Sequence, residues 1–248
     1  MNSAAAVPLR LVAFGDLEGS VWGAAVAAPE PAIVFGADAA SESMAGRTQV
    51  QFVAEHDSWH LRGDGFDLVV SPQAPAEAAA GAGTDQLCTV TGTITVAGAT
   101  RAIECLGTRS VDTGFEPAGL DSLRSVASWF APDRGLTLRA LRPRRARGQE
   151  ADRMAATLLD PDGPVAVDDP RLSTTYGAGE RPARTSLELW ITVGEDQYPR
   201  RAAGEALGTG GAAHTDGLTL EVTPLRCHAN GLDGAGVYLL ARFPVSGH

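Results

Sequence analysis

The sequence contains no lysine, and all twenty of its basic residues are arginine. This absence excludes a lysine that forms a Schiff base with a carbonyl substrate, and it excludes the lysine of a Walker-type phosphate loop. The composition offers a genomic cause, because alanine, glycine, arginine and aspartate are all heavily used, as in a GC-rich coding sequence. We favour that cause over selection for arginine chemistry.

The chain has fewer positive than negative charges. Thirty acidic residues outnumber the arginines, which gives a formal net charge of −10 and a pI near 4.9. Binding to nucleic acid or to anionic lipid needs a basic surface, so we expect no nucleic-acid partner. No segment approaches the roughly eighteen apolar residues of a transmembrane helix, and we expect no membrane insertion. The first twenty residues lack the features of a signal peptide.

Cysteine is rare, with only Cys88, Cys105 and Cys227 in the chain. None of them has the spacing of a CxxC motif or of a zinc site. Cys88 and Cys105 can lie on neighbouring strands of one hairpin, but the odd count favours free buried thiols in a reducing compartment. Neither a GxSxG motif nor a GxGxxG motif that opens a helix is present. We therefore expect a cytoplasmic protein without a cofactor or metal.

Strand patterns fill what remains of the chain. Most apolar segments alternate with period 2 and are separated by Gly, Pro or Asp. Residues 87–107 predict a hairpin, because Val90, Ile94 and Val96 share one face and 97–100 form a Gly-containing turn. Residues 50–70 predict a three-strand meander. Residues 76–80 and 201–207 are the two stretches considered for a turn of helix, and a longer irregular segment is expected after 107.

The length of 248 residues allows one large β domain or two small ones. The clearest boundary lies near 110–120, and each side has about the number of strands that a small barrel or sandwich needs. We predict an all-β protein with an N-terminal domain over 8–115 and a C-terminal domain over 116–248.

Four phrases resemble a known family: SWHLRGDGFDLVVSP (58–72), CTVTGTITVAG followed by IECLGTRS (88–110), SVASWFAPDRGLTLRALRP (125–143) and RLSTTYGAGERPARTSLELW (171–190). Together they are similar to the carotenoid-hydratase-like and AttH-like proteins, over roughly residues 10 to 245. The resemblance implies two lipocalin-like (calycin) antiparallel β-barrel or half-barrel domains packed together, with a ligand cavity inside or between them. Gly107 and Arg109 match the family pattern, but no His or Trp follows them directly, so no catalytic role is carried over.

The expected function is the binding of a small, largely apolar molecule in a barrel cavity. Relatives implied by the resemblance include polyene hydratases and pericyclic cyclases, so cofactor-free hydration, isomerisation or cyclisation of that molecule is the enzymatic form of this hypothesis. Such chemistry requires a buried carboxyl group with a raised pKa, and Glu188, Asp121 and Glu104 are the catalytic candidates. The alternative is an interaction or structural protein that has filled barrels and acts through its surface, for example by pairing with a second copy.

Six residues are candidates for ligand binding. Some of these candidates belong to the irregular segment 107–130, because loops on a β scaffold often carry function. The other candidates follow from the predicted strand on which Glu188 and Trp190 share a face, because a carboxyl group packed on an aromatic ring can have a raised pKa. The structural alternatives are an Asp121–Arg124 ion pair and a strand with one solvent face. The six candidates are Arg109, Arg124, Trp129, Tyr176, Trp190 and Arg201.

Three further patterns are interpreted as structural. His56 and His60 lie four apart, but residues 55–58 are turn formers, so we favour a hairpin over a metal site. The Arg-Gly-Asp triplet at 62–64 is interpreted as a turn. The arginine-rich stretch 139–153 is interpreted as a solvated strand end and loop balanced by the acidic 160–170, rather than as an anion clamp.

Overall fold

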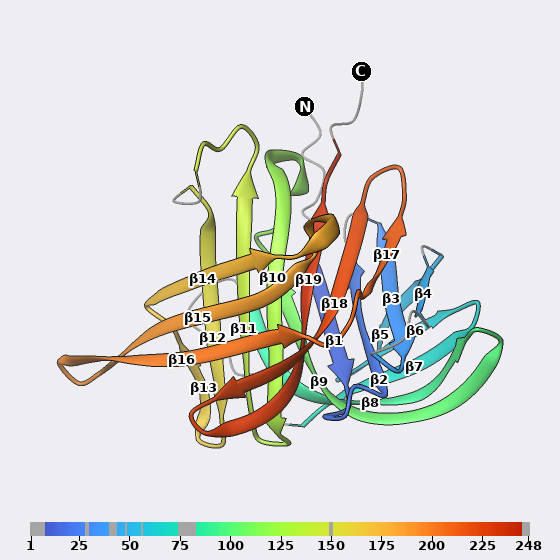
Figure 1. Cartoon of the computed structure of the whole chain (residues 1–248), viewed down its shortest axis with the longest axis horizontal. Helices are drawn as coiled ribbons and strands as arrows, with labels where there is room; N and C mark the ends of the chain where they lie inside the picture. Colours follow the sequence, from blue (N-terminus) through green and yellow to red (C-terminus); the bar gives the residue numbers. More distant parts are fainter. Residues whose placement is uncertain are drawn as a thin grey trace.

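The computed structural model of the chain describes residues 8–27, 30–39, 44–47, 49–55, 57–73, 83–148 and 151–244. Within these ranges every regular element is a β-strand or a 3-10 turn, which confirms the all-β class. The strands lie in two large antiparallel sheets (Figure 1). No helix in the described part of the chain is long and apolar enough to cross a membrane.

The first sheet contains nine strands in the order β4-β3-β2-β1-β9-β8-β7-β6-β5. It curls into what we call the first half-barrel. Its strands are β1 (Leu9–Gly15), β2 (Val21–Ala27), β3 (Pro31–Ala37), β4 (Met44–Arg47), β5 (Gln51–Glu55), β6 (Ser58–Gly63), β7 (Phe66–Pro72), β8 (Gly83–Val96) and β9 (Ala99–Asp112).

The second sheet contains ten strands in the order β13-β12-β11-β10-β19-β18-β16-β15-β14, and β17 pairs with β18 beside this path. We call it the second half-barrel. Its strands are β10 (Leu120–Ala131), β11 (Arg134–Pro143), β12 (Arg153–Asp160), β13 (Gly163–Ala166), β14 (Asp169–Tyr176), β15 (Pro182–Val193), β16 (Asp196–Ala206), β17 (Gly211–His214), β18 (Thr219–Ala229) and β19 (Leu232–Arg242). Two 3-10 turns complete the elements, η1 (Pro117–Gly119) and η2 (Ala178–Glu180).

Both sheets follow one topological plan. Each begins at its centre, runs outward as a meander to one edge, and then continues from the opposite edge back to the centre. The first and last strands of each sheet are therefore hydrogen-bonded neighbours, β1 with β9 and β10 with β19. The chain passes from one sheet to the other between Asp112 and Leu120. A division into two domains at 115/116 stays a prediction.

The expected hairpins are confirmed by the strand register. Val96 pairs with Ala99 across the turn of the β8–β9 hairpin. Strands β5, β6 and β7 form the expected meander. Asp64 and Gly65 form the tight turn between β6 and β7, and Gly65 has the positive φ of 81° that favours glycine there.

Two local expectations are wrong. Residues 201–207 were expected to allow a turn of helix, but 201–206 belong to strand β16, because their small and polar side chains alternate between a buried and an exposed face. The irregular segment after 107 is shorter than expected, since β9 continues to Asp112 and β10 begins at Leu120. His56 and the run 76–80 lie outside the described residues.

Three apolar clusters hold the fold together. One fills the concave face of the first half-barrel, one fills that of the second, and a third lies between the two sheets. Strand β1 contributes side chains to two of these clusters. Leu9 and Leu11 face the other sheet, while Val12 and Phe14 face the interior of the first half-barrel. This double burial explains why the strand is almost continuously apolar.

Candidate functional site

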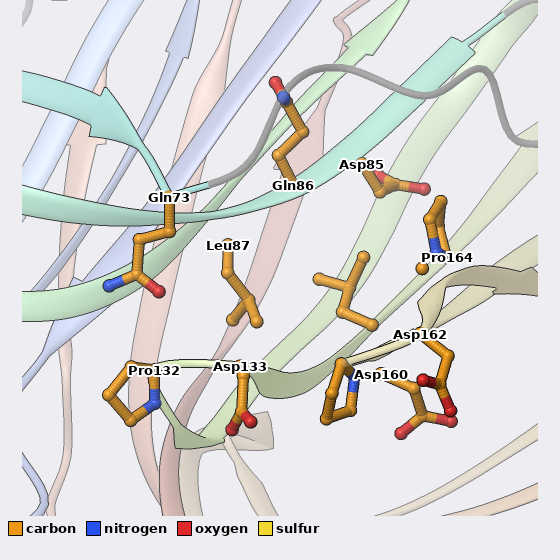
Figure 2. A pocket seen from close by; sticks show the side chains of 12 residues that line it. Gln73, Asp85, Gln86, Leu87, Pro132, Asp133, Asp160, Asp162 and Pro164 are labelled. Atoms are coloured by element: carbon orange, nitrogen blue, oxygen red, sulfur yellow. The ribbon is translucent and has the colours of Figure 1, made fainter.

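A cavity of about 250 Å³ lies between the two half-barrels, and we call it the junction cavity (Figure 2). Three turns or strand ends meet there: the end of β7 with the start of β8, the β10–β11 turn, and the β12–β13 turn. Its apolar wall consists of Leu87, Pro132, Leu159, Pro161 and Pro164. Small-molecule sites are typically concave and mostly apolar, with a few placed polar groups.

Asp85 is the buried acidic group of the junction cavity, with 3% of its surface exposed. Ser110 donates a hydrogen bond of 2.5 Å to its Oδ1, and the Thr157 hydroxyl donates one of 2.7 Å to its Oδ2. The Arg139 Nη2 lies 3.4 Å from the same Oδ2. Because Arg139 and Thr157 belong to the second half-barrel and Asp85 to the first, this carboxylate also ties the two sheets together.

The rim of the junction cavity is acidic. Asp133 lies in the β10–β11 turn, and Asp160 and Asp162 lie at the β12–β13 turn (Figure 2). None of the 12 lining residues is basic. Within the described part of the chain no group of three or more His, Cys, Asp or Glu side chains is placed to hold a metal ion.

A larger cavity of about 500 Å³ opens at one end of the second half-barrel, and we call it the mouth cavity. It lies on the other side of the β12–β13 turn, since Asp160, Pro161 and Asp162 line both cavities. Its floor is formed by Phe130, Leu136 and Leu158, and its polar residues include Arg134 and Arg200.

Away from these two cavities, apolar side chains pack the concave faces. Phe14, Phe35, Leu61, Leu68 and Ile94 are fully buried in the first half-barrel. The junction cavity and the mouth cavity therefore lie at the junction of the sheets and at the end of the second half-barrel, and not in the interior of the first half-barrel.

Arg109, a predicted ligand residue, lies inside the first half-barrel. Its Nε donates a hydrogen bond of 2.8 Å to Gln86 Oε1, its Nη1 donates to the Asp57 carbonyl, and its guanidinium lies 4.9 Å from the Trp59 ring centre. Burial lowers the pKa of Arg109, while Cys88 and Asp57 oppose that shift. These contacts hold the turn between β5 and β6 against β8 and β9.

The structure brings two of the predicted ligand residues, Arg124 and Tyr176, within hydrogen-bond distance of each other. Arg124 donates a hydrogen bond to the buried Asp152, and the Tyr176 hydroxyl lies 3.4 Å from that of Tyr238. Burial raises the pKa of Tyr238, and Tyr176 adds to the shift while Arg124 opposes it. Arg124 thus pairs with Asp152 rather than with Asp121, which is exposed three positions earlier on β10.

The other predicted residues lie outside the linings of the two cavities. Trp129 lies in the core between the sheets, where its Nε1 donates a hydrogen bond of 2.9 Å to the Gly15 carbonyl. Glu104 is exposed on β9. Glu188 and Trp190 face away from the core, because Leu187, Leu189 and Ile191 occupy the inward positions of β15. Arg201 is exposed and pairs in register with Glu188 on that outer face.

Sequence reasoning missed the residues around the two cavities. Asp85 and Asp152 are the buried acidic residues of the described chain, and each lies beside an arginine from a distant strand. The alternation of β16 could have indicated Arg200 instead of Arg201, since Ala202 packs in the barrel core and Arg200 shares its face. No local sequence signal marks Asp85.

The arrangement of two curled sheets is the fold of solved lipocalin-like proteins. An AttH-like protein from Nitrosomonas europaea has a TM-score of 0.60 and 13% identity, over 95% of this chain and 92% of that one. Kievitone hydratase from Nectria haematococca has a TM-score of 0.61 and 10% identity, over 95% and 88%. CghA, also solved with Sch210972, has a TM-score of 0.62 and 11% identity, over 97% and 89%.

These likenesses confirm the fold that the resemblance implied, namely two lipocalin-like half-barrels packed together. The identities are low, so the comparison establishes architecture alone. No protein-family model matches the sequence, and no curated protein matches it.

Proposed function

We propose that the protein binds a small, largely apolar molecule in the junction cavity. The observation that carries this proposal is the combination of an apolar wall with one buried carboxylate, Asp85, in a concave space between two sheets. The apolar wall supplies affinity through removal of ligand surface from water. Asp85 supplies orientation, because a carboxylate accepts hydrogen bonds from a ligand hydroxyl or N–H group.

The similarity of the fold to that of the solved lipocalin-like proteins supports this proposal. One neighbour is a hydratase by name, and another was solved with a small molecule bound. Cofactor-free addition of water to the ligand is therefore the second candidate function. Addition of water transfers one proton and one hydroxide to the two carbons of a double bond, and water supplies both. The Asp85 carboxylate, paired with Arg139, favours this reaction because a buried negative charge stabilises the positive charge that develops on the substrate when the proton adds.

The binding proposal is tested by fluorescence titration with N-phenyl-1-naphthylamine, a neutral apolar probe. Gln73 is exposed at the edge of the junction cavity, and Asp133 lies on its rim, so Gln73→Trp and Asp133→Trp each place an indole in the opening (Figure 2). Gln197→Trp is the matched control, because Gln197 is also an exposed glutamine and lies on β16, outside the lining of the cavity. We expect both blocking variants to weaken the probe by tenfold or more and the control to bind like the parent. Equal binding by all three variants would overturn the proposal.

The hydration candidate is tested with a molecule that native mass spectrometry identifies on the purified chain. Incubation in oxygen-18-labelled water should add one labelled water to it with the parent protein and none with Asp85→Asn. Retained labelling in the variant would refute a role for Asp85, whereas binding without labelling in the parent would leave a binding protein without this activity.

A further inference from the structure

The mouth cavity differs in charge from the junction cavity. Its lining includes two arginines, Arg134 and Arg200, whereas the junction cavity has no basic residue. Both arginines are exposed, and each lies on the inward face of its strand by alternation. Arg134 shares a face with the buried Leu136 and Leu138 of β11, and Arg200 shares one with the buried Ala202 of β16. Basic residues at inward positions of a barrel strand are costly unless they reach solvent or a partner.

Neither arginine has an ion pair in the described part of the chain. The acidic residues that also line the mouth cavity, Asp160 and Asp162, are not within salt-bridge distance of either guanidinium. By contrast, the inward-facing Arg124 of the same half-barrel is paired with Asp152. Arg134 and Arg200 are thus free to bind an anion above an apolar floor.

We propose that the mouth cavity is a second binding site, and that it takes an apolar molecule carrying one carboxylate or sulfonate group. Phe130, Leu136 and Leu158 would contact the apolar body of the molecule. The two guanidinium groups approach from β11 and β16, and their planar forks suit the oxygens of such an anion. The volume of about 500 Å³ falls within the usual range of ligand pockets.

The acidic residues of the shared β12–β13 turn oppose this preference. Asp160 and Asp162 place negative charge on the wall between the two cavities, so they should reduce the affinity for an anion without abolishing it. The proposal therefore predicts opposite changes in anion affinity for two kinds of substitution. Neutralising an arginine should weaken the binding of an anion, and neutralising Asp162 should strengthen it.

The experiment uses two fluorescent probes that share an apolar body, 1-anilinonaphthalene-8-sulfonate and its neutral counterpart N-phenyl-1-naphthylamine. Both are titrated into the Gln73→Trp protein, in which the junction cavity is blocked. We expect Arg134→Gln and Arg200→Gln each to weaken the sulfonate about tenfold and to change the neutral probe less than twofold. Arg101→Gln, an exposed arginine of β9, is the matched control and should change neither. Asp162→Asn should tighten the sulfonate about twofold to threefold.

Three results would overturn the proposal: unchanged sulfonate affinity in both arginine variants, equal losses for the two probes, or weaker sulfonate binding in Asp162→Asn. A common unfolding midpoint for all variants in urea shows that losses come from the site and not from the fold. The junction-cavity proposal is tested separately. Its readout is the weaker binding of the neutral probe when Gln73→Trp or Asp133→Trp blocks the junction, whereas the mouth-cavity proposal is read from the sulfonate in protein whose junction is already blocked.

Discussion

Two ion pairs of this protein have nearly the same length but very different burial. The Arg139 Nη2 lies 3.4 Å from Asp85 Oδ2, and the Arg62 Nε lies 3.3 Å from Asp67 Oδ1. The side chains of the first pair are 11% and 2% exposed, and those of the second are 55% and 60% exposed. Replacement of each aspartate by alanine therefore compares the contribution of a buried and of an exposed carboxylate to the free energy of unfolding.

The magnitudes follow from the surroundings. At an effective dielectric constant near 20, two unit charges 3.4 Å apart attract by about 5 kcal/mol, which is an upper bound on the pair. Asp85→Ala also leaves Arg139, Ser110 and Thr157 without their buried acceptor, and breaking a buried pair in this way typically costs about 3–5 kcal/mol. Asp67→Ala should cost about 0.2–1 kcal/mol, because water and salt screen the exposed pair.

The assay is equilibrium unfolding in urea, read as a shift in midpoint at constant slope. The companion variants Arg139→Gln and Arg62→Gln complete a double-mutant cycle for each pair. We expect a coupling energy well above 1 kcal/mol for Asp85 with Arg139 and below 1 kcal/mol for Asp67 with Arg62. A loss below about 1 kcal/mol for Asp85→Ala would refute the conclusion that Asp85 ties the half-barrels together.

Three further predictions concern the core. Trp129→Phe removes the indole N–H that donates a hydrogen bond to the Gly15 carbonyl across the two sheets. This substitution should lower the free energy of unfolding in urea by about 1–2 kcal/mol. An unchanged free energy of unfolding would show that water replaces the indole as the donor. Burial raises the pKa of Cys105 to about 12 and of Cys227 to about 11, so the native thiols should resist a disulfide reagent at pH 8 and react only in denaturant. Rapid native labelling would contradict this burial. Because these pKa values are raised in the folded state, the thiols of the unfolded chain lose their protons at a lower pH than the native thiols do. The free energy of unfolding should therefore fall as the pH rises from about 9 toward 11–12. The double variant Cys105→Ser with Cys227→Ser should show a smaller decline.

The strand pattern predicted much of the fold because alternation is a local property. The β8–β9 hairpin and the meander β5–β7 follow from period-2 patterns and from glycine-bearing turns. Residues 201–207 misled because alanine favours helix in isolation, whereas pairing with β15 and β18 decides the conformation of this segment.

The sites were predicted less well because they depend on contacts between distant strands. The partner of Arg124 is Asp152, 28 residues away, and Thr157 reaches Asp85 across 72 residues. Glu188 and Trp190 share a face, as expected, but only the position of the sheet in three dimensions shows that the face is the outer one. A cytoplasmic location and pairing with a second copy stay predictions from the sequence.

Native mass spectrometry of the purified protein against a denatured control tests the central claim most directly. We predict a non-covalent adduct of a few hundred daltons on the parent chain and on Gln197→Trp, and its absence from Gln73→Trp and Asp133→Trp. An adduct that survives in both blocking variants would place the ligand elsewhere. A parent chain without any adduct, even after incubation with N-phenyl-1-naphthylamine, would contradict a ligand-binding junction cavity and favour a protein that acts through its surface.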